Sequence, residues 1–296
     1  MIDFVIMTDS CCDLPKEYIF DNKIPFAMLP FSYNDKEYLD DLGQSISQKQ
    51  FFDDLRAGAL PNTSQANSES FYNIFKPAAE QGMDIVYIGV SSGLSGTYNS
   101  ANIAKTTILE EFPSVSIYII DVLTASLGQG LMVMKAVEMK NLGCNAEQIV
   151  SEIEKNIQNL NTYITVDDLN FLKRGGRISN VAATLGLVLH LKPILTLNQV
   201  GRVMPVLKVR GRKKSITKLA EIVMEKIKKP ETQTIAICHA DCYEEAVKLK
   251  KEILTKVQVK EVIIHFIGPV VGRFSGPGAL AVFFIGESRQ HHVIDI

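Results

Sequence analysis

Runs of consecutive apolar residues alternate with segments of helical periodicity along the first 160 residues. The apolar runs predict strands at residues 4–7, 24–31, 85–90 and 115–120. The periodic segments predict helices at residues 48–55, 68–79, 95–109, 126–139 and 146–156. Because this alternation is typical of βαβ units, it predicts a parallel sheet with helices on both faces.

The regular alternation of predicted strands and helices ends between residues 163 and 168. A basic turn at residues 173–177 leads into a predicted helix from Ser179, and two strands at residues 194–197 and 203–209 form a hairpin-like pair. The remaining helices and strands are predicted at residues 213–228, 234–238, 243–254, 259–266 and 279–285. We therefore expect an α/β protein of two domains. Residues 1–164 form an N-terminal α/β/α domain with a parallel sheet, and residues 165–296 form a smaller C-terminal α+β domain with a mixed sheet.

The composition is that of an ordinary globular protein. The chain has 296 residues, of which 46% are apolar and 22% charged, so it is long enough for two domains. Its net charge of -2 argues against a dedicated nucleic-acid-binding protein, which usually carries a strong basic excess. The N-terminus lacks the features of a signal peptide, and the longest apolar stretch, residues 181–191, is shorter than the roughly 20 residues of a membrane span. These features predict a soluble cytoplasmic protein without a nucleic-acid partner.

The chain contains five cysteines, a number that forms no even disulfide framework and suggests a reducing compartment. Cys238, His239 and Cys242 lie close enough in sequence to suggest a metal site. Because no second cluster of Cys or His follows at zinc-site spacing, buried thiols are the favoured interpretation, and we predict no metal.

A loop rich in serine and glycine, residues 91–98, carries the strongest functional signal. It follows the apolar run at residues 85–90, and Ser95 stands where the N-cap of the next helix is expected. Ligands of open α/β sheets bind beyond the carboxyl ends of the strands, where helix N-termini attract anions. The loop contains no Lys or Arg, which argues against a nucleotide phosphate loop and favours a smaller anion such as a carboxylate. Alternatively, Ser91, Ser92 and Ser95 only cap the helix.

Polar residues elsewhere are expected near this serine-rich loop. Asp9 and Asp121 each end a predicted strand, so parallel pairing would bring both to the same edge of the sheet. The hydroxyls of residues 61–65 either point into a crevice or belong to a turn before a helix that is capped by Asn67 or Ser68.

Two further segments have an unusual composition. Residues 268–278 contain four glycines and two prolines, which fix an unusual backbone path that we expect to pack closely against the ligand or the other domain. Residues 208–218 carry six cations and no acid. They form either a solvated helix start or a docking patch for an acidic partner or an anionic surface.

Several short motifs follow one another in a fixed order along the chain. They are Thr8-Asp9-Ser10 with Asp13, Thr63-Ser64-Gln65, residues 91–98, Asp121, residues 171–178, Leu191-Lys192-Pro193-Ile194 and Gly276-Pro277-Gly278-Ala279. In this order, these motifs resemble the DegV family, the bacterial fatty-acid-binding proteins. The resemblance implies that the two domains hold a long-chain fatty acid between them in an apolar tunnel, which the second domain closes.

The resemblance also implies roles for individual residues. A threonine and a serine hold the ligand carboxylate in the family, and they correspond to Thr63 and Ser95, with Ser92 and Gly96 in the same loop. A separate fatty acid kinase subunit then phosphorylates the carboxylate with ATP. The resemblance therefore implies a binding protein that is not an enzyme and has no cofactor other than the bound fatty acid.

The kinase subunit is expected to dock on a positive surface. In the family that surface maps to Arg174, Arg177 and Arg210, and transient contact with an anionic membrane surface is also expected. Alternatively, Arg174 and Arg177 only brace the turn at residues 175–176.

One position departs from the family pattern. The family usually has a His in its Gly-rich segment that helps to hold the carboxylate, and the matching residue here is Phe274, beside Arg273. Because phenylalanine cannot donate a hydrogen bond, either the head group is held differently or the protein binds another lipid-like ligand. If the segment is extended, Arg273 and Phe274 point to opposite faces.

The sizes of the energy contributions indicate that fatty acid binding survives the replacement of the family's His by Phe274. Burial of about fifteen methylenes contributes on the order of 12 kcal/mol, whereas one charge-assisted hydrogen bond contributes roughly 1.5 to 3 kcal/mol. The orientation of the carboxylate is the property at risk.

The alternative function is a serine esterase that uses Ser95. Residues 93–96 lack the final glycine spacing of a Gly-x-Ser-x-Gly motif, and the sequence identifies no base, so we favour the lipid-binding function.

Overall fold

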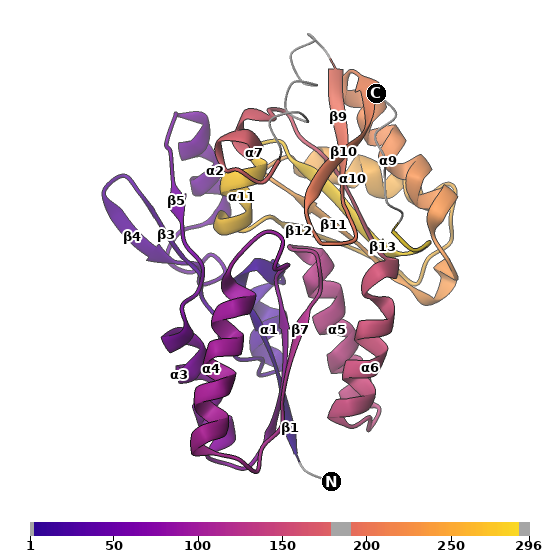
Figure 1. Cartoon of the computed structure of the whole chain (residues 1–296). Helices are drawn as coiled ribbons and strands as arrows, with labels where there is room; N and C mark the ends of the chain where they lie inside the picture. The colour runs from indigo at the N-terminus through magenta and orange to yellow at the C-terminus, as the bar shows by residue number, and fades with distance from the viewer. Residues whose placement is uncertain (1–2, 179–190, 290–296) are drawn as a thin grey trace.

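The computed structural model describes residues 3–178 and 191–289, which form two lobes that are each built around a main sheet (Figure 1). The strands of the first main sheet are β1 (Phe4–Asp9), β2 (Phe26–Ala27), β6 (Asp84–Gly89) and β7 (Ile117–Asp121). The helices of this lobe are α1 (Lys16–Asp21), α2 (Gln48–Arg56), α3 (Ser68–Ala79), α4 (Thr97–Glu111), α5 (Leu127–Asn141) and α6 (Ala146–Asn156). The sheet is parallel in the order β2-β1-β6-β7, with α3 and α4 on one side and α5 and α6 on the other. The predicted parallel α/β/α arrangement is confirmed.

Strand β6 shows why the apolar runs mark the strands of this sheet. All six of its residues are buried, from Asp84 to Gly89. A parallel strand between two layers of helices needs apolar side chains on both faces, so its sequence reads as a continuous apolar run. The helix that precedes it, α3, begins after Asn67, whose side chain accepts a hydrogen bond from the backbone N–H of Ser70, as one of the predicted caps requires.

The second lobe contains a mixed sheet. Its strands are β8 (Leu160–Thr165), β9 (Leu191–Leu197), β10 (Val203–Arg210), β11 (Thr234–His239), β12 (Glu261–Phe266) and β13 (Leu280–Ile285). They lie in the order β10-β9-β8-β13-β11-β12, and only the β11 and β12 pair is parallel. The longer helices α9 (Arg212–Lys226) and α10 (Tyr243–Leu254) pack against each other. The mixed sheet and the β9–β10 hairpin were both predicted.

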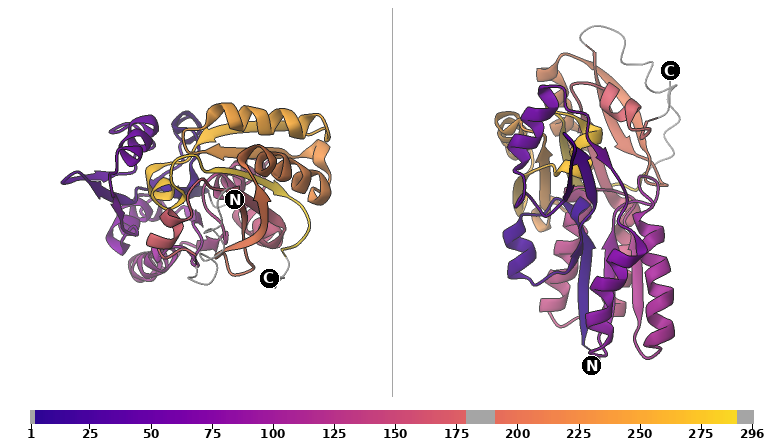
Figure 2. Two further views of the ribbon diagram at one scale, coloured as in Figure 1. Left: turned by 90° about the horizontal axis from the view of Figure 1, so that it is seen from above. Right: turned by 90° about the vertical axis from the view of Figure 1, so that its left-hand side faces the viewer.

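Side chains of this sheet alternate between two cores. On β11, Ile235 and Ile237 belong to the apolar cluster that includes residues of α9 and α10, whereas Ala236 and Cys238 belong to the cluster of the first lobe. Because neighbouring side chains on a strand point to opposite faces, one face of the sheet is left to meet the first lobe. The right-hand view of Figure 2 shows the two lobes stacked along the long axis of the molecule.

A small antiparallel sheet projects from the first lobe. Its strands are β3 (Pro30–Tyr33), β4 (Lys36–Leu39) and β5 (Asn62–Thr63), in the order β4-β3-β5. The rings of Phe31, Tyr33 and Tyr38 stack on one another within it. The single extended stretch predicted at residues 24–31 is therefore wrong, since β2 and β3 are separate strands in different sheets.

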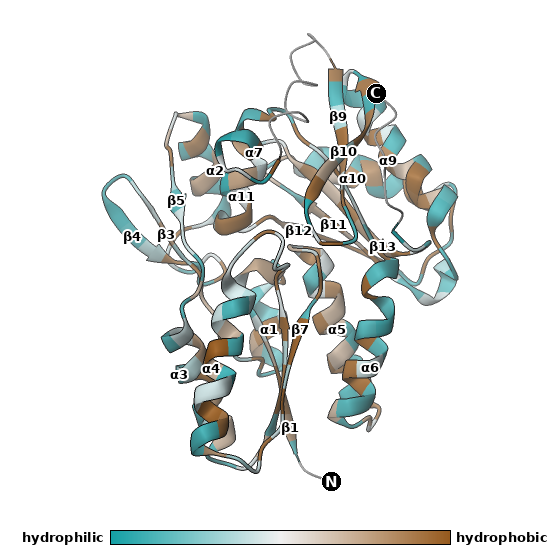
Figure 3. Ribbon diagram, viewed as in Figure 1, coloured by the Kyte–Doolittle hydropathy of each residue, from teal (hydrophilic) through white to brown (hydrophobic). Residues whose placement is uncertain are grey.

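Short elements complete the described chain. They are α7 (Asn170–Arg174), α11 (Pro269–Ser275) and the 3₁₀ turns η1 (Ser10–Cys12), η2 (Ile157–Asn159) and η4 (Pro230–Thr232). Figure 3 shows largely apolar strands β1 and β7, and helices α4, α6 and α9 that carry both polar and apolar residues. Across residues 3–178 and 191–289, no helix combines the length and the apolar character that crossing a bilayer requires.

Three predictions concern the domain boundary, the cap of α4 and a helix from Ser179. The first of the two domains was expected to end at residue 164, which lies inside β8, a strand of the second sheet. Ser95 was expected as the N-cap of α4, but the cap residue is Gly96 and the helix begins at Thr97. The predicted helix from Ser179 lies outside the described residues.

Candidate functional site

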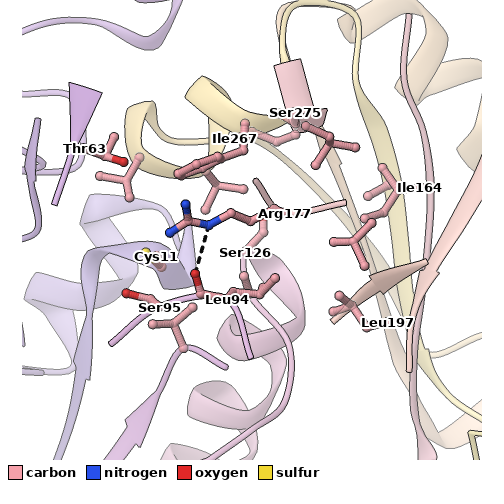
Figure 4. A pocket seen from close by; sticks show the side chains of 18 of the residues that line it. Cys11, Thr63, Leu94, Ser95, Ser126, Ile164, Arg177, Leu197, Ile267 and Ser275 are labelled. Carbon is pink, nitrogen blue, oxygen red and sulfur yellow. Dashed lines mark hydrogen bonds between the residues drawn. The ribbon is translucent and has the colours of Figure 1, made fainter. Parts of the chain in front are cut away.

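A pocket lies between the two lobes, and side chains of both form its walls (Figure 4). Strands β8 and β13 contribute alternate residues that face the first lobe, namely Thr162, Ile164, Ala281 and Phe283. Most of the wall is apolar, so the pocket suits a hydrophobic ligand. Its other apolar lining residues include Leu29, Val90, Leu94, Val166, Leu172, Leu197, Val203, Ile267, Val270 and Val271.

The serine-rich loop is fixed at the carboxyl edge of the first sheet. Asp9 Oδ2 accepts a hydrogen bond from the backbone N–H of Val90 at 3.0 Å, and Asp121 Oδ1 accepts one from Ser92 N–H at 3.2 Å. The expected meeting of Asp9, Asp121 and the loop at one edge is confirmed. Ser91 is buried, and its hydroxyl donates to the carbonyl of Gly201 in the β9–β10 hairpin at 3.0 Å. This hydrogen bond joins the serine-rich loop of the first lobe to the hairpin of the second.

The residues proposed for the carboxylate occupy different places. Thr63, Ser95 and Gly96 all line the pocket. Ser92 is exposed and does not belong to the pocket wall. A side chain on Gly96 would overlap Gln65, which also lines the pocket, so the absence of a Cβ lets the two polar segments approach each other.

The hydroxyl of Ser95 contacts Thr97, two residues further along the chain. It accepts a hydrogen bond from Thr97 N–H at 3.2 Å and lies 2.8 Å from the hydroxyl of Thr97. Within the described residues, these contacts give Ser95 no imidazole or carboxylate that would act as a base.

Phe274 lies in the pocket wall beneath two arginines. The Arg177 Cζ lies 4.3 Å from the centroid of the Phe274 ring, and the Arg273 Cζ lies 4.9 Å from it. The segment forms helix α11, so the extended path that would point Arg273 and Phe274 to opposite faces is not present. A side chain on Gly175 would overlap the same ring, so this glycine allows the basic turn to approach α11.

Arg177 supplies the cation that the serine-rich loop lacks. Its Nε donates to the carbonyl of Leu94 at 3.1 Å, its Nη1 donates to the carbonyl of Gly175 at 2.7 Å, and its side chain lines the pocket. Figure 4 shows the guanidinium between Thr63 and Ser95. The sequence alone does not predict this arrangement, because Arg177 and Ser95 come from different lobes.

Comparison with known proteins accounts for this architecture. The family model described as "Uncharacterised protein, DegV family" matches residues 3–287. The chain belongs to the DegV family. It is 43% identical over 290 residues to a DegV domain-containing protein of Clostridium perfringens, which covers 98% of this chain and 100% of the relative.

Solved structures of the DegV family share the fold. One is described as showing fatty acid binding of a DegV family protein from Thermus thermophilus, with 29% identity and a TM-score of 0.87 over 97% of this chain and 100% of that one. Another is described as DegV, a fatty acid binding protein from Bacillus subtilis, with 29% identity and a TM-score of 0.84 over 97% of this chain and 100% of that one.

The residues expected on the docking surface of this DegV protein are arranged unevenly. Arg174 is exposed and lies over the ring of Phe171 at 4.9 Å, and Arg210 is exposed at the end of β10. Arg177 is half-buried in the pocket wall. Of the six cations at residues 208–218, Arg212 pairs with Glu245 and Lys218 with Glu221, so tertiary contacts neutralise part of this basic stretch.

The residues that suggested a metal site, Cys238, His239 and Cys242, form hydrogen bonds with groups of the protein. Ser126 Oγ donates to Cys238 Sγ at 3.2 Å, and Cys242 N–H donates to His239 Nδ1 at 3.4 Å. Burial lowers the pKa of His239 to about 4. No group of three or more Cys, His, Asp or Glu side chains in the described part of the chain is placed to hold a metal ion.

Two buried carboxyl groups lie beside the pocket: Asp13, which belongs to the motif of Thr8-Asp9-Ser10 with Asp13, and Asp40, which belongs to none of the sequence motifs. Asp13 accepts a hydrogen bond at 2.9 Å from the N–H of Gly268, the residue before α11, and burial raises the pKa of Asp13 well above its usual range. Asp40 is also buried, and burial raises its pKa to about 7. These groups therefore lie where the first lobe meets the helix that carries Phe274.

Proposed function

We propose that this DegV protein binds a long-chain fatty acid in the pocket between its lobes, with the carboxylate at Thr63 and Ser95. The observation that carries the proposal is a largely apolar pocket whose wall includes hydroxyls from both the serine-rich loop and residues 61–65, namely those of Ser95, Thr63 and Ser64. An alkyl chain gains free energy from burial along the wall, and hydroxyl donors stabilise a carboxylate that has left water. The fatty acid binding described for the Thermus thermophilus and Bacillus subtilis relatives supports the same ligand class.

We further propose that the protein has no catalysis of its own and presents the carboxylate to a separate fatty acid kinase subunit, which forms the acyl phosphate. The support is the family resemblance together with the local partners of Ser95, which include no base among the described residues. A carboxylate near the edge of the pocket is accessible to a kinase, whereas the alkyl chain stays covered. Cytoplasmic location and transient contact with an anionic membrane belong to the same proposal.

The ligand is tested with the purified full-length protein. Denaturation, solvent extraction and mass spectrometry should release about one fatty acid per chain, and protein stripped of lipid should bind added oleate or palmitate. An extract without fatty acid, from a protein that also fails to bind both acids, would contradict the proposal.

Two variants in one loop test the carboxylate site. Ser95→Ala removes a hydroxyl of the pocket wall and should weaken oleate binding roughly tenfold, as loss of one charge-assisted hydrogen bond predicts. Ser92→Ala is the matched control, because Ser92 is exposed outside the wall, and its affinity should stay within about twofold of the wild type. Equal effects of the two substitutions would exclude the assignment of Ser95.

A further inference from the structure

Two buried carboxyl groups lie at the start of α11. A Cβ added to Gly268 would lie 2.6 Å from Asp13 Oδ1 and 3.3 Å from Asp40 Oδ2, so both oxygens lie close to the same point of the backbone. Asp13 is 3% exposed and Asp40 is 2% exposed, so bulk water reaches neither of them. Two negative charges this close together in a buried site repel each other, and such a pair loses its two protons in separate steps.

Polar groups of the chain stabilise the charged form of this pair only in part. Asp13 accepts hydrogen bonds from Gly268 N–H at 2.9 Å and from the hydroxyl of Ser126 at 2.5 Å. Asp40 Oδ2 has no hydrogen-bond partner in the part of the chain that the structure describes. Burial raises the pKa of Asp40 to about 7, and the donors that offset part of this burial are the hydroxyl of Ser10 and the N–H groups of Leu42 and Val270. Protonation removes a charge that is costly to bury, so the pair is suited to hold a proton.

The titratable groups around the pair either oppose its ionisation or stay neutral. They are the carboxyl groups of Asp9 and Asp41 and the thiols of Cys11, Cys12 and Cys238. Charge on the two neighbouring carboxyl groups raises the pKa of the pair, and burial raises the pKa of the three thiols, which therefore remain protonated. Arg273, the cation of α11, donates instead to the carbonyl of Pro61 at 3.0 Å.

The pair lies directly behind the wall of the ligand pocket. Ser126, which donates to Asp13, lines the pocket, and so do Ile267 and Val270 on the two sides of Gly268 (Figure 4). Helix α11 adds further wall residues, namely Val271, Phe274 and Ser275. Without a ligand, water in the pocket can solvate this wall, whereas an alkyl chain excludes that water. Ligand binding therefore deepens the burial of the pair and favours its protonated form.

We infer that Asp13 and Asp40 form a proton-binding site linked to the ligand pocket, so that the protein takes up a proton when it binds a fatty acid. This inference rests on the proposed function and deepens it. The linkage is reciprocal, so binding that takes up protons weakens as pH rises. Because the pKa of Asp40 is about 7, the affinity for oleate should fall about two- to tenfold per pH unit between about pH 7 and pH 8.5, as uptake of about 0.3 to 1 proton requires.

Calorimetric titration of the lipid-free full-length protein with oleate tests the proton site. Heats measured at about pH 7.5 in phosphate and in Tris, whose ionisation enthalpies differ, give the number of protons taken up per oleate, which should be about 0.3 to 1 for the wild type. The double variant with Asp13→Asn and Asp40→Asn carries neutral groups of nearly the same shape, so it should lose both the uptake and the pH dependence of affinity. Asp35→Asn makes the same change at an exposed position and is the matched control, which should behave as the wild type.

The outcomes separate the inference from the proposed function. If the wild type binds oleate without proton uptake, the inference is wrong and the fatty acid function stands. The carboxylate of oleate is the competing proton site, and uptake that persists unchanged in the double variant would assign the proton there and overturn the inference. If the double variant does not fold, infrared difference spectra of the wild type with isotope-labelled aspartate should show a labelled, protonated carboxyl gained on oleate binding, and its absence would equally overturn the inference. A wild type that binds no fatty acid defeats the proposed function itself.

Discussion

Asp40 is a carboxyl group that folding removes from water. It is 2% exposed, and its Oδ2 has no hydrogen-bond partner among the described residues. Burial without full compensation favours the protonated form, and the pKa rises from 3.8 to about 7. The charge of Asp41 also raises the pKa of Asp40, and Asp40 in turn raises the pKa of Asp13. Protonation of this pair therefore matters for the contact with α11.

The shift of Asp40 predicts a pH dependence of stability. Between about pH 4 and pH 7 the folded protein keeps a proton that the unfolded chain has lost, so the free energy of unfolding falls as pH rises, by about 1.4 kcal/mol per pH unit from this group. Asp40→Asn removes the contribution, so the free energy of unfolding of the variant should rise relative to that of the wild type between about pH 4 and pH 7 and stay level above that. Urea unfolding at each pH measures this. Asp35→Asn, at an exposed position, is the control and should follow the wild type; an Asp40→Asn curve parallel to the wild type would refute the prediction.

The β9–β10 hairpin is the element that clamps the serine-rich loop. Its tip brings the carbonyl of Val200 against Gly93 and the carbonyl of Gly201 to the hydroxyl of Ser91. Gly201 has a φ of +69° and no space for a Cβ, because Ser91 Oγ occupies it. A hairpin of the second lobe thus sets the position of a loop in the first.

The substitution Gly201→Ala tests whether the close contact with Ser91 lowers stability in addition to the strain of a positive φ. The control is Gly143→Ala, because Gly143 also has a positive φ, +86°, but nothing lies within 4 Å of its added Cβ. Both substitutions should cost about 1 to 2 kcal/mol for the left-handed conformation. Gly201→Ala should cost at least about 1 kcal/mol more and weaken oleate binding, because the loop must move. Chemical unfolding and oleate titration test this, and equal losses at the two sites would rule out the clamp.

At the scale of the whole molecule, charged contacts hold the two lobes together at their periphery. Arg56 of α2 donates to Asp241 after β11, and Lys260 Nζ lies 3.3 Å from Glu138 Oε1 of α5. The pocket lies between the lobes, so separation of the lobes would open it. The exposed arginines Arg174 and Arg210 do not take part in these contacts among the described residues, which leaves them available to a partner.

Charge reversal tests whether this surface docks a kinase. Arg210→Glu should reduce stimulation of a fatty acid kinase subunit at least about tenfold while oleate affinity stays unchanged, because like charges oppose docking and the residue lies outside the pocket. Arg202→Glu makes the same change at an exposed position near the start of β10 and should have a much smaller effect. Kinase assays over a range of salt concentrations measure both variants. Wild-type stimulation by Arg210→Glu would count against the docking role.

The sequence by itself determined the parallel sheet, its helices and the family. Strand β6 was predictable because burial on both faces demands a continuous apolar run, and Asn67 was predictable because a cap acts on a backbone N–H only three residues away. Such signals are local, so they survive without knowledge of the fold. The meeting of Asp9 and Asp121 followed from the same logic, since parallel strands end at one edge.

Only the tertiary structure decided which charges meet. The pairing of Arg212 with Glu245 and the stacking of Arg177 on Phe274 join residues far apart in sequence, and no periodicity encodes them. The helix α11 escaped prediction because its glycines and prolines favour turns locally, while packing against the basic turn and the buried carboxyl of Asp13 stabilises a helix there. Local sequence patterns therefore determine the helices and strands. The pocket is determined by the tertiary structure, because residues that line its wall come from both lobes and only folding brings them into contact.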